Sequence, residues 1–217
     1  MPRTNNEALL NNKNHKPFII FRFLIYLDKS FSIYFWKFLD IFACKNIKIA
    51  DFYEKAIGKQ YTKEYDRFGL LKYNKILHIG CGAYPLTEIT LTNSSNIKVV
   101  GIDKNPDAVV LAKEIIRRKK LEKKVTIIDG DGINYSADGF DVIIISSCST
   151  PKEKVLENIF KQANKNSIII VRTIDSALNN ILKYINGNKD VKYVKKLHFS
   201  TFFLKPNFWY SLYLIKK

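Results

Sequence analysis

Residues 75–85 read KILHIGCGAYP, a short apolar run that leads into a loop with two glycines. Glycine lacks a Cβ, so Gly80 and Gly82 let the backbone turn sharply and let a ligand approach it closely. Pro85 suits the first turn of a helix, whose free N–H groups favour an anionic group such as a carboxylate. A dinucleotide-binding GxGxxG loop would need glycine where Pro85 stands, which argues against NAD. The stretch therefore predicts a strand, a ligand-binding loop and a helix.

The pattern after Pro85 is one of alternating strands and helices. Apolar runs predict strands at residues 75–79, 97–102, 125–128, 140–145 and 167–171, with helices at 85–91, 106–119, from 151 onward and at 175–185. Strands that alternate with helices of this length indicate a parallel sheet with right-handed crossovers. Two aromatic-rich runs, residues 191–204 and 208–215, predict a closing antiparallel hairpin. The fold class expected is α/β, a mostly parallel, doubly wound sheet with a C-terminal antiparallel hairpin and an N-terminal helical segment.

The composition of the 217 residues is that of a globular protein with a strongly basic balance. Lys and Arg total 36 against 20 Asp and Glu, a net charge of +16, and a basic exterior attracts nucleic acid, acidic membranes or anionic substrates. The three cysteines form no CxxC pair and the three histidines no HExxH motif, so we expect no metal site. Sparse, unpaired cysteines fit a reducing cytoplasm, which is the location that we expect.

The N-terminal segment of residues 17–43 is rich in apolar side chains, which raises the question of membrane contact. Its first run, residues 18–27, contains Arg22 and is shorter than the roughly 20 apolar residues that a spanning helix needs. Further on, apolar residues recur at helical spacing and form one stripe: Phe31, Tyr34, Phe35, Phe38, Leu39 and Phe42. We expect this stripe to pack against the rest of the protein. A peripheral membrane contact through residues 17–43, or a partner-binding face, is the alternative.

An acidic residue, Asp103, ends the second predicted strand, roughly 20 residues after Gly82. The carboxyl end of a parallel strand is where the ligands of open α/β sheets collect. A carboxylate there can accept hydrogen bonds from both hydroxyls of a ribose, which favours a ligand that contains a nucleoside. The alternative role of Asp103 is to cap the helix that begins near Pro106.

The loops after the third and fourth predicted strands add further candidates. Asp131 is in a position to accept a hydrogen bond from an adenine amino group, with Gly132 leaving space for the ring. Asp129 competes for that role, and a plain turn would also explain the Gly-Asp-Gly sequence. Ser146 ends the fourth strand and would border the reactive end of the ligand. Cys81 has no base beside it in the sequence, so we expect a space-filling side chain in the loop rather than a nucleophile.

Three stretches together resemble the class I S-adenosylmethionine-dependent methyltransferase superfamily and, more narrowly, the nicotianamine synthase family. They are IGCGAYPLT at residues 79–87, the segment from FDV at 140–142 to TPK at 150–152, and Arg172-Thr173 at the end of the fifth strand. The resemblance extends over residues 50–190. It implies a Rossmann-like domain over residues 71–217 that binds S-adenosylmethionine, preceded by a helical cap over residues 1–70.

The resemblance also implies a reaction, the transfer of the 3-amino-3-carboxypropyl group of S-adenosylmethionine to a small-molecule amine. The co-substrate-binding residues that it implies are Gly80, Cys81, Gly82, Pro85, Asp103, Asp131, Gly132 and Ser146. Relatives use a Glu and a Tyr from the helical half to handle the attacking amine, and Tyr53 and Glu64 fit that spacing best. The alternative for both side chains is a solvated, partly packed helix without a catalytic role.

Two other functions stay open at the level of sequence. A methyltransferase acting on a small molecule, protein or RNA would use the same co-substrate, although the Asn/Asp-Pro-Pro-aromatic motif of base-amine methylation is replaced by SSCSTP at residues 146–151. A non-catalytic basic module would bind RNA or an anionic membrane through RRKKLEKK at residues 117–124. That run suits a solvated helix end, where cations complement the helix dipole, so nucleic acid is not the favoured partner. The residues indicate no oligomeric state.

Overall fold

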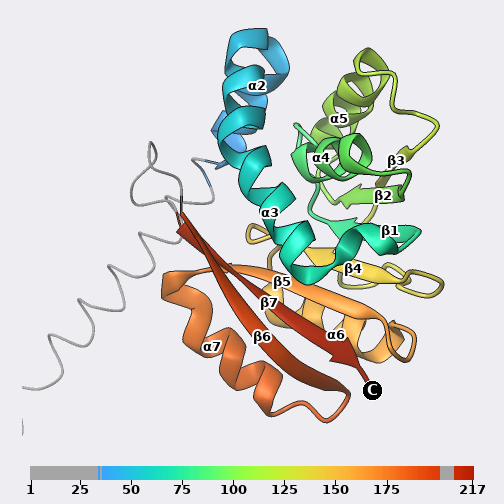
Figure 1. The fold of residues 1–217 in the computed structure, drawn as a ribbon, viewed down its shortest axis with the longest axis vertical. Helices are drawn as coiled ribbons and strands as arrows, with labels where there is room; N and C mark the ends of the chain where they lie inside the picture. Colours follow the sequence, from blue (N-terminus) through green and yellow to red (C-terminus); the bar gives the residue numbers. More distant parts are fainter. Residues whose placement is uncertain (1–33, 35, 201–207) are drawn as a thin grey trace, which may run out of the picture.

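The computed structural model describes residue 34, residues 36–200 and residues 208–217 of the chain. Its centre is a seven-stranded sheet with the order β3-β2-β1-β4-β5-β7-β6 (Figure 1). The strands of these described residues are β1 (Lys75–Ile79), β2 (Lys98–Asp103), β3 (Val125–Asp129), β4 (Val142–Ile145), β5 (Ile168–Ile174), β6 (Val191–Ser200) and β7 (Phe208–Lys216). The first five pair in parallel and β7 runs antiparallel to both β5 and β6, which confirms the predicted Rossmann-like methyltransferase fold.

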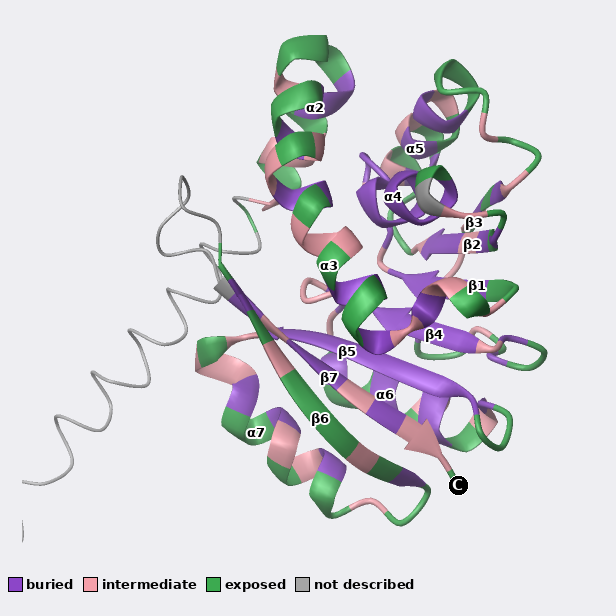
Figure 2. Cartoon of the chain, in the orientation of Figure 1, coloured by how far each residue is buried: buried purple, intermediate pink, exposed green. Residues whose placement is uncertain are grey.

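Helices cover both faces of the sheet. After a helix over residues 36–45, the helices are α2 (Ile47–Tyr53), the π-helical turn η1 (Glu54–Gly58), α3 (Lys59–Phe68), the short turn η2 (Leu70–Lys72), α4 (Leu86–Ser94), α5 (Pro106–Arg118), α6 (Lys152–Gln162) and α7 (Asp175–Asn186). Alternate residues of the central strands point to opposite faces. Leu77 and Ile143 pack with α6 and α7, whereas Ile76 and Ile144 pack on the side of α3 and α4. Burial on both faces explains the unbroken apolar sequence of β4, and Figure 2 shows β4 and β5 as buried strands.

The N-terminal helices pack into the same apolar clusters as the sheet domain. Tyr53 and Ile57 lie in one cluster with Ile89 of α4. Tyr65 belongs to a second cluster with Ile76 of β1. The N-terminal helices therefore pack directly against the sheet domain. The domain division at residue 70 stays a prediction.

The aromatic stripe of the N-terminal segment packs only in part as the sequence predicted. Leu39 packs against an apolar cluster of the domain, whereas three other members are exposed, and Phe35 lies outside the described residues. Residues 36–45 are helical, but Tyr34, Phe38 and Phe42 are 72%, 60% and 43% exposed. The buried face of this helix carries Ala43 and Cys44 instead, because small side chains let it approach the glycine loop, where the Cys44 thiol donates to the carbonyl of Ala83 at 3.3 Å. Phe31 and residues 17–33 lie outside the described residues, among which no helix has the length and apolarity needed to span a membrane.

Candidate functional site

A cavity of about 460 Å³ lies at the carboxyl ends of β1, β2 and β4, against the N-terminal helices. This volume is in the usual range for small-molecule sites. Most of the residues predicted for the site line it: Tyr53, Gly80, Cys81, Gly82, Asp103, Asp131, Gly132 and Ser146. Pro85 and Glu64 are not in the lining. Pro85 instead precedes the first residue of α4, and its carbonyl accepts from the N–H of Ile89 at 3.0 Å.

The glycine loop needs glycine at two positions. Gly80 and Gly82 have φ values of +81° and +71°, a region that side chains with a Cβ rarely adopt. A Cβ on Gly80 would lie 2.6 Å from the Ser149 hydroxyl oxygen, and one on Gly82 would lie 2.3 Å from a carboxylate oxygen of Asp40. The backbone at Gly82 therefore reaches the cavity wall directly, with Asp40 immediately against it.

Asp103 connects the end of β2 to this loop. One carboxylate oxygen accepts from the N–H of Gly82 at 2.9 Å, and the other accepts from the N–H of Asn105 at 3.0 Å. The helix cap considered for Asp103 is made by Asn105, whose side chain accepts from the N–H of Asp107. A carboxylate has about four lone-pair sites, so two acceptor positions of Asp103 are left for a ligand in the cavity.

The loop after β3 brings Asp131 to the cavity, whereas Asp129 is exposed and absent from the lining. One oxygen of Asp131 accepts from the N–H of Ile133 at 3.1 Å. Packing gives Gly132 a further reason, because a Cβ there would lie 2.5 Å from Ile79, while the space that it leaves for an adenine ring stays a prediction. Gly132 is thus required by packing of the loop against β1.

Cys81 and Ser146 border the cavity in different ways. Cys81 is 4% exposed, and burial raises the pKa of its thiol well above the ordinary value, so its thiolate is not populated at neutral pH. Ser146 directly follows β4, its N–H donates to the carbonyl of Ile79 at 3.0 Å, and its carbonyl accepts from the Lys152 ammonium. Both residues hold the shape of the loop, as the space-filling interpretation of Cys81 predicted.

A carboxylate that the sequence analysis missed, Asp40, stands beside the glycine loop. It lines the cavity and accepts a hydrogen bond from the Tyr53 hydroxyl at 3.0 Å. Burial raises the pKa of Asp40 to about 8; the hydrogen bond from Tyr53 opposes this shift, and the charge of Asp103 adds to it. The signal was present in the sequence, because Asp40 is the single acidic residue between Asp28 and Asp51, within an apolar helix.

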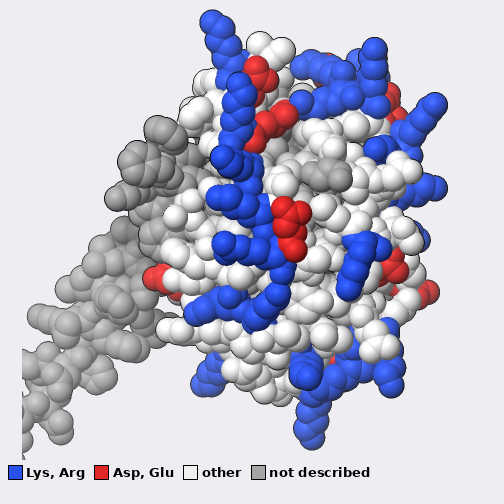
Figure 3. All heavy atoms as spheres, in the orientation of Figure 1, with Lys and Arg blue, Asp and Glu red and all other residues white. Residues whose placement is uncertain are grey.

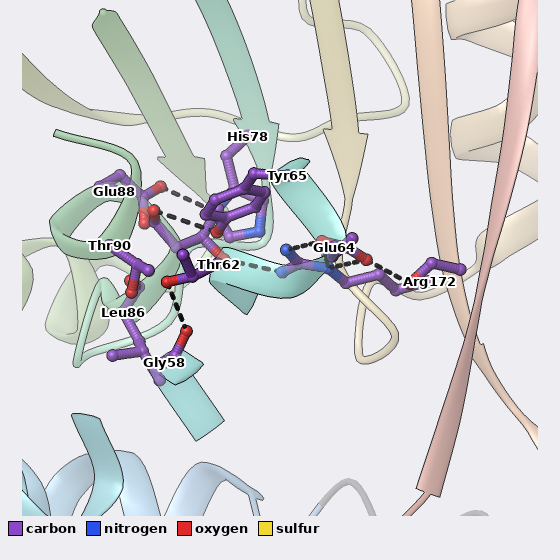
Figure 4. A network of polar contacts seen from close by, with 11 residues as sticks. Gly58, Thr62, Glu64, Tyr65, His78, Leu86, Glu88, Thr90 and Arg172 are labelled. Atoms are coloured by element: carbon purple, nitrogen blue, oxygen red, sulfur yellow. Dashed lines mark hydrogen bonds and ion pairs between the residues drawn. The ribbon is translucent and has the colours of Figure 1, made fainter. Parts of the chain in front are cut away.

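Glu64, predicted as a catalytic residue, lies in a buried ion pair behind the cavity wall. It is 0% exposed, and its carboxylate accepts from the guanidinium of Arg172 at 2.5–3.2 Å and from the hydroxyl of Ser211 (Figure 4). Its oxygens are taken up by these donors, and the side chain does not reach the cavity. The structure therefore places Glu64 where it positions Arg172 and not where it could take a proton from a substrate.

Arg172 is a buried cationic group of the site, whereas Lys37 and Lys104, which also line the cavity, are exposed. Arg172 lies at the end of β5, lines the cavity, and donates to the Thr87 hydroxyl at 2.7 Å, while its guanidinium lies 3.8 Å from the ring centre of Tyr61. Burial alone would lower the pKa of Arg172, but the contact with Glu64 outweighs it and keeps the pKa well above its ordinary value. Arg172 is thus a permanent, oriented cation next to the N-terminal turn of α4.

The chain is similar to known proteins in both sequence and structure. A family described as a methyltransferase domain matches residues 71–203. L-histidine 2-aminobutanoyltransferase of Yersinia pestis is 26% identical over 130 residues, which are 59% of this chain and 48% of the relative. A probable cobalt-precorrin-6B C(15)-methyltransferase (decarboxylating) of Methanobrevibacter smithii is 27% identical over 126 residues, 57% of this chain and 65% of the relative. The chain thus spans about half to two thirds of the length of these relatives.

Among solved structures, the chain is similar to a variant of the nicotianamine synthase MtNAS, with a TM-score of 0.71 at 17% identity over 88% of this chain and 75% of the other. It is also similar to a magnesium protoporphyrin IX methyltransferase from Synechocystis with bound S-adenosylmethionine, with a TM-score of 0.60 at 15% identity over 74% of this chain and 79% of the other. At these identities the likeness shows the shared fold.

Proposed function

The chain belongs to the methyltransferase-domain family, a family of S-adenosylmethionine-dependent transferases, and we propose that the group it transfers is the 3-amino-3-carboxypropyl chain rather than the methyl group. The acceptor in this proposal is a small-molecule amine. The observation that carries the proposal is the Asp40–Tyr53 pair, which faces the same cavity as the glycine loop.

The cavity fits S-adenosylmethionine. The backbone of Gly80 and Gly82 lines the cavity without a Cβ, and the two spare acceptor positions of Asp103 suit the ribose hydroxyls. Asp131 is the acceptor available to the adenine amino group. Arg172 and the N-terminal turn of α4 suit the carboxylate of the donor, because a cation and free N–H groups both favour an anion.

The residues of this chain would then act on the acceptor amine. S-adenosylmethionine supplies a sulfonium, which is a good leaving group. The acceptor nitrogen forms a bond to the side-chain carbon next to sulfur, the carbon–sulfur bond breaks, and its electron pair stays on sulfur as methylthioadenosine leaves. The proton that the nitrogen loses passes to the Asp40 carboxylate, which the Tyr53 hydroxyl holds in place.

The share of the chain that the structural similarity to MtNAS covers supports transfer of the 3-amino-3-carboxypropyl chain. The similarity to MtNAS covers 88% of the chain, so it must include part of residues 1–70, from which Asp40 and Tyr53 come. The similarity to the protoporphyrin methyltransferase covers 74%. The Yersinia pestis relative is named an aminobutanoyltransferase, a name that also describes transfer of a four-carbon amino-acid chain.

Methyl transfer is the second candidate. It is favoured by the description of the matching family and by the name of the Methanobrevibacter smithii relative. The glycine loop and Asp103 serve both reactions equally, because they contact the shared nucleoside part of the co-substrate.

The first prediction concerns Asp103. Asp103→Ala should weaken S-adenosylmethionine binding by roughly 1.5–3 kcal/mol, or about 10- to 150-fold, the range for a hydrogen-bonded charged partner. Isothermal titration calorimetry measures the affinity, with thermal unfolding as a check on the loop. Asp129→Asn is the matched control, because Asp129 ends the neighbouring strand in register with Asp103 but is exposed. Equal affinity in wild type and Asp103→Ala would contradict the ribose assignment.

The second prediction separates the two reactions by their nucleoside product. Incubation with S-adenosylmethionine and pooled amino acids or a cell extract should yield methylthioadenosine above a no-enzyme blank, measured by mass spectrometry. The blank is needed because S-adenosylmethionine decays to methylthioadenosine unaided. Enzyme-dependent S-adenosylhomocysteine without methylthioadenosine above the blank would decide for methyl transfer.

A further inference from the structure

The outward side of the helix over residues 36–45 is apolar where a soluble surface is normally polar. Tyr34, Phe38, Ile41 and Phe42, here called the aromatic face, are all exposed. The rings of Phe38 and Phe42 are in contact, with centroids 4.3 Å apart. Contiguous exposed apolar side chains mark sites of protein or membrane interaction. We therefore expect the aromatic face to be covered by a partner or a membrane.

Cations accompany the aromatic face. Lys37 and Lys45 lie on the same helix and Lys48 lies at the start of α2; all three are exposed, and no ion pair joins them to a carboxylate of the described residues. Figure 3 shows that Lys and Arg side chains also form a column over α2 and α3. Apolar rings together with unpaired lysines are the combination found on helices that lie in the surface of an anionic bilayer.

We propose that the aromatic face docks on the surface of an anionic lipid bilayer. A second copy of the chain fits less well, because a two-fold interface presents the same surface on both copies and would bring two sets of the exposed Lys37, Lys45 and Lys48 together. Anionic headgroups instead match these cations.

Docking through this face would bring the cavity to the membrane. Lys37 and Ile41 belong both to the exposed helix and to the lining of the cavity. The opening beside them then lies at the level of the headgroups, and the bilayer shields that side of the site from bulk water.

Vesicle sedimentation with the full chain tests the proposal. Wild type should sediment with vesicles of phosphatidylcholine and phosphatidylglycerol at about 150 mM salt and should stay partly bound at about 500 mM, because apolar insertion is not screened. Phe38→Ser with Phe42→Ser should weaken the association about tenfold or more, since two exposed rings are lost. Lys37→Gln with Lys45→Gln and Lys48→Gln should remove the preference for anionic over neutral vesicles.

Val110→Ser is the matched control, because Val110 is 65% exposed on α5 and is not a member of the aromatic face, and it should bind as wild type does. Circular dichroism and thermal unfolding check that each variant folds. Wild type that stays in the supernatant, or a double Phe variant that sediments like wild type, would overturn the proposal. A wild-type dimer that the double Phe variant converts to monomer, without vesicle binding, would assign the face to a second copy and also overturn it.

Discussion

Asp40→Asn should lower kcat for methylthioadenosine release about 10²- to 10⁴-fold, the range for loss of a general base. Asparagine keeps the size of the side chain and can still accept from Tyr53, but it cannot take a proton from the acceptor amine. Affinity for S-adenosylmethionine should change little, because the glycine loop and Asp103 are intact. Asp51→Asn on α2 is the matched control, since Asp51 is exposed and outside the cavity. Unchanged turnover in Asp40→Asn would remove Asp40 from the mechanism.

The pH dependence gives the same experiment a second readout. The pKa of Asp40 in the folded protein is raised to about 8 by burial, and only the carboxylate form is a base. For wild type, kcat/KM should therefore rise with pH and level off above about 8. The acceptor amine also loses its proton in this range, so the informative quantity is the difference between the wild-type and Asp40→Asn profiles.

The free energy of unfolding should fall as pH rises, whereas kcat/KM should increase. The folded state holds the Asp40 proton up to about pH 8, whereas the unfolded chain releases it near the ordinary value of 3.8. The stabilisation is complete below the unfolded pKa and is lost as pH rises through the folded pKa. Thermal unfolding of the unliganded protein should show a steeper loss of stability towards pH 8 in wild type than in Asp40→Asn.

The sequence was sufficient for the sheet and for the position of the glycine loop and Asp103 at the cavity because both depend on local patterns. The apolar run of β4 and the glycine loop after β1 can each be recognised within about ten residues, and Asp103 follows from its place at the end of a strand. The bounds differ modestly, as for β5, which continues to Ile174 where the sequence suggested residue 171.

The other half of the site depends on contacts that no local pattern contains. The helix over residues 36–45 has apolar side chains around most of its circumference, so its periodicity could not decide which face is buried. The small Ala43 and Cys44 are buried in place of the larger rings. With the helix in this orientation, Asp40 lines the cavity. The family resemblance suggested a catalytic role for Glu64 from its spacing in the helical half. Its partner in the structure is Arg172, 108 residues away in the sequence, and no local pattern could reveal that contact.

Glu64→Gln should destabilise the protein by about 3–5 kcal/mol, the cost of removing one partner of a buried ion pair. The pair is almost fully buried, with Glu64 0% and Arg172 2% exposed. The variant would leave the guanidinium uncompensated and would weaken the acceptor of the Ser211 hydroxyl. Urea unfolding measures the change. Glu114→Gln is the matched control, because the Arg118–Glu114 pair is solvent-exposed and such pairs contribute about 0–1 kcal/mol. A loss for Glu64→Gln no larger than the control's would contradict the prediction.

The double variant Glu64→Leu with Arg172→Met tests why the chain keeps these charges. Replacing a whole buried ion pair with apolar side chains is often neutral or stabilising, so the double variant should recover most of the stability that Glu64→Gln loses. It should nevertheless bind S-adenosylmethionine more weakly than wild type, because the cation beside Thr87 and the N-terminal turn of α4 is gone. Recovered stability with reduced affinity would mean that Glu64 serves the site by fixing Arg172. Recovered stability with unchanged affinity would mean that Arg172 does not contact the donor.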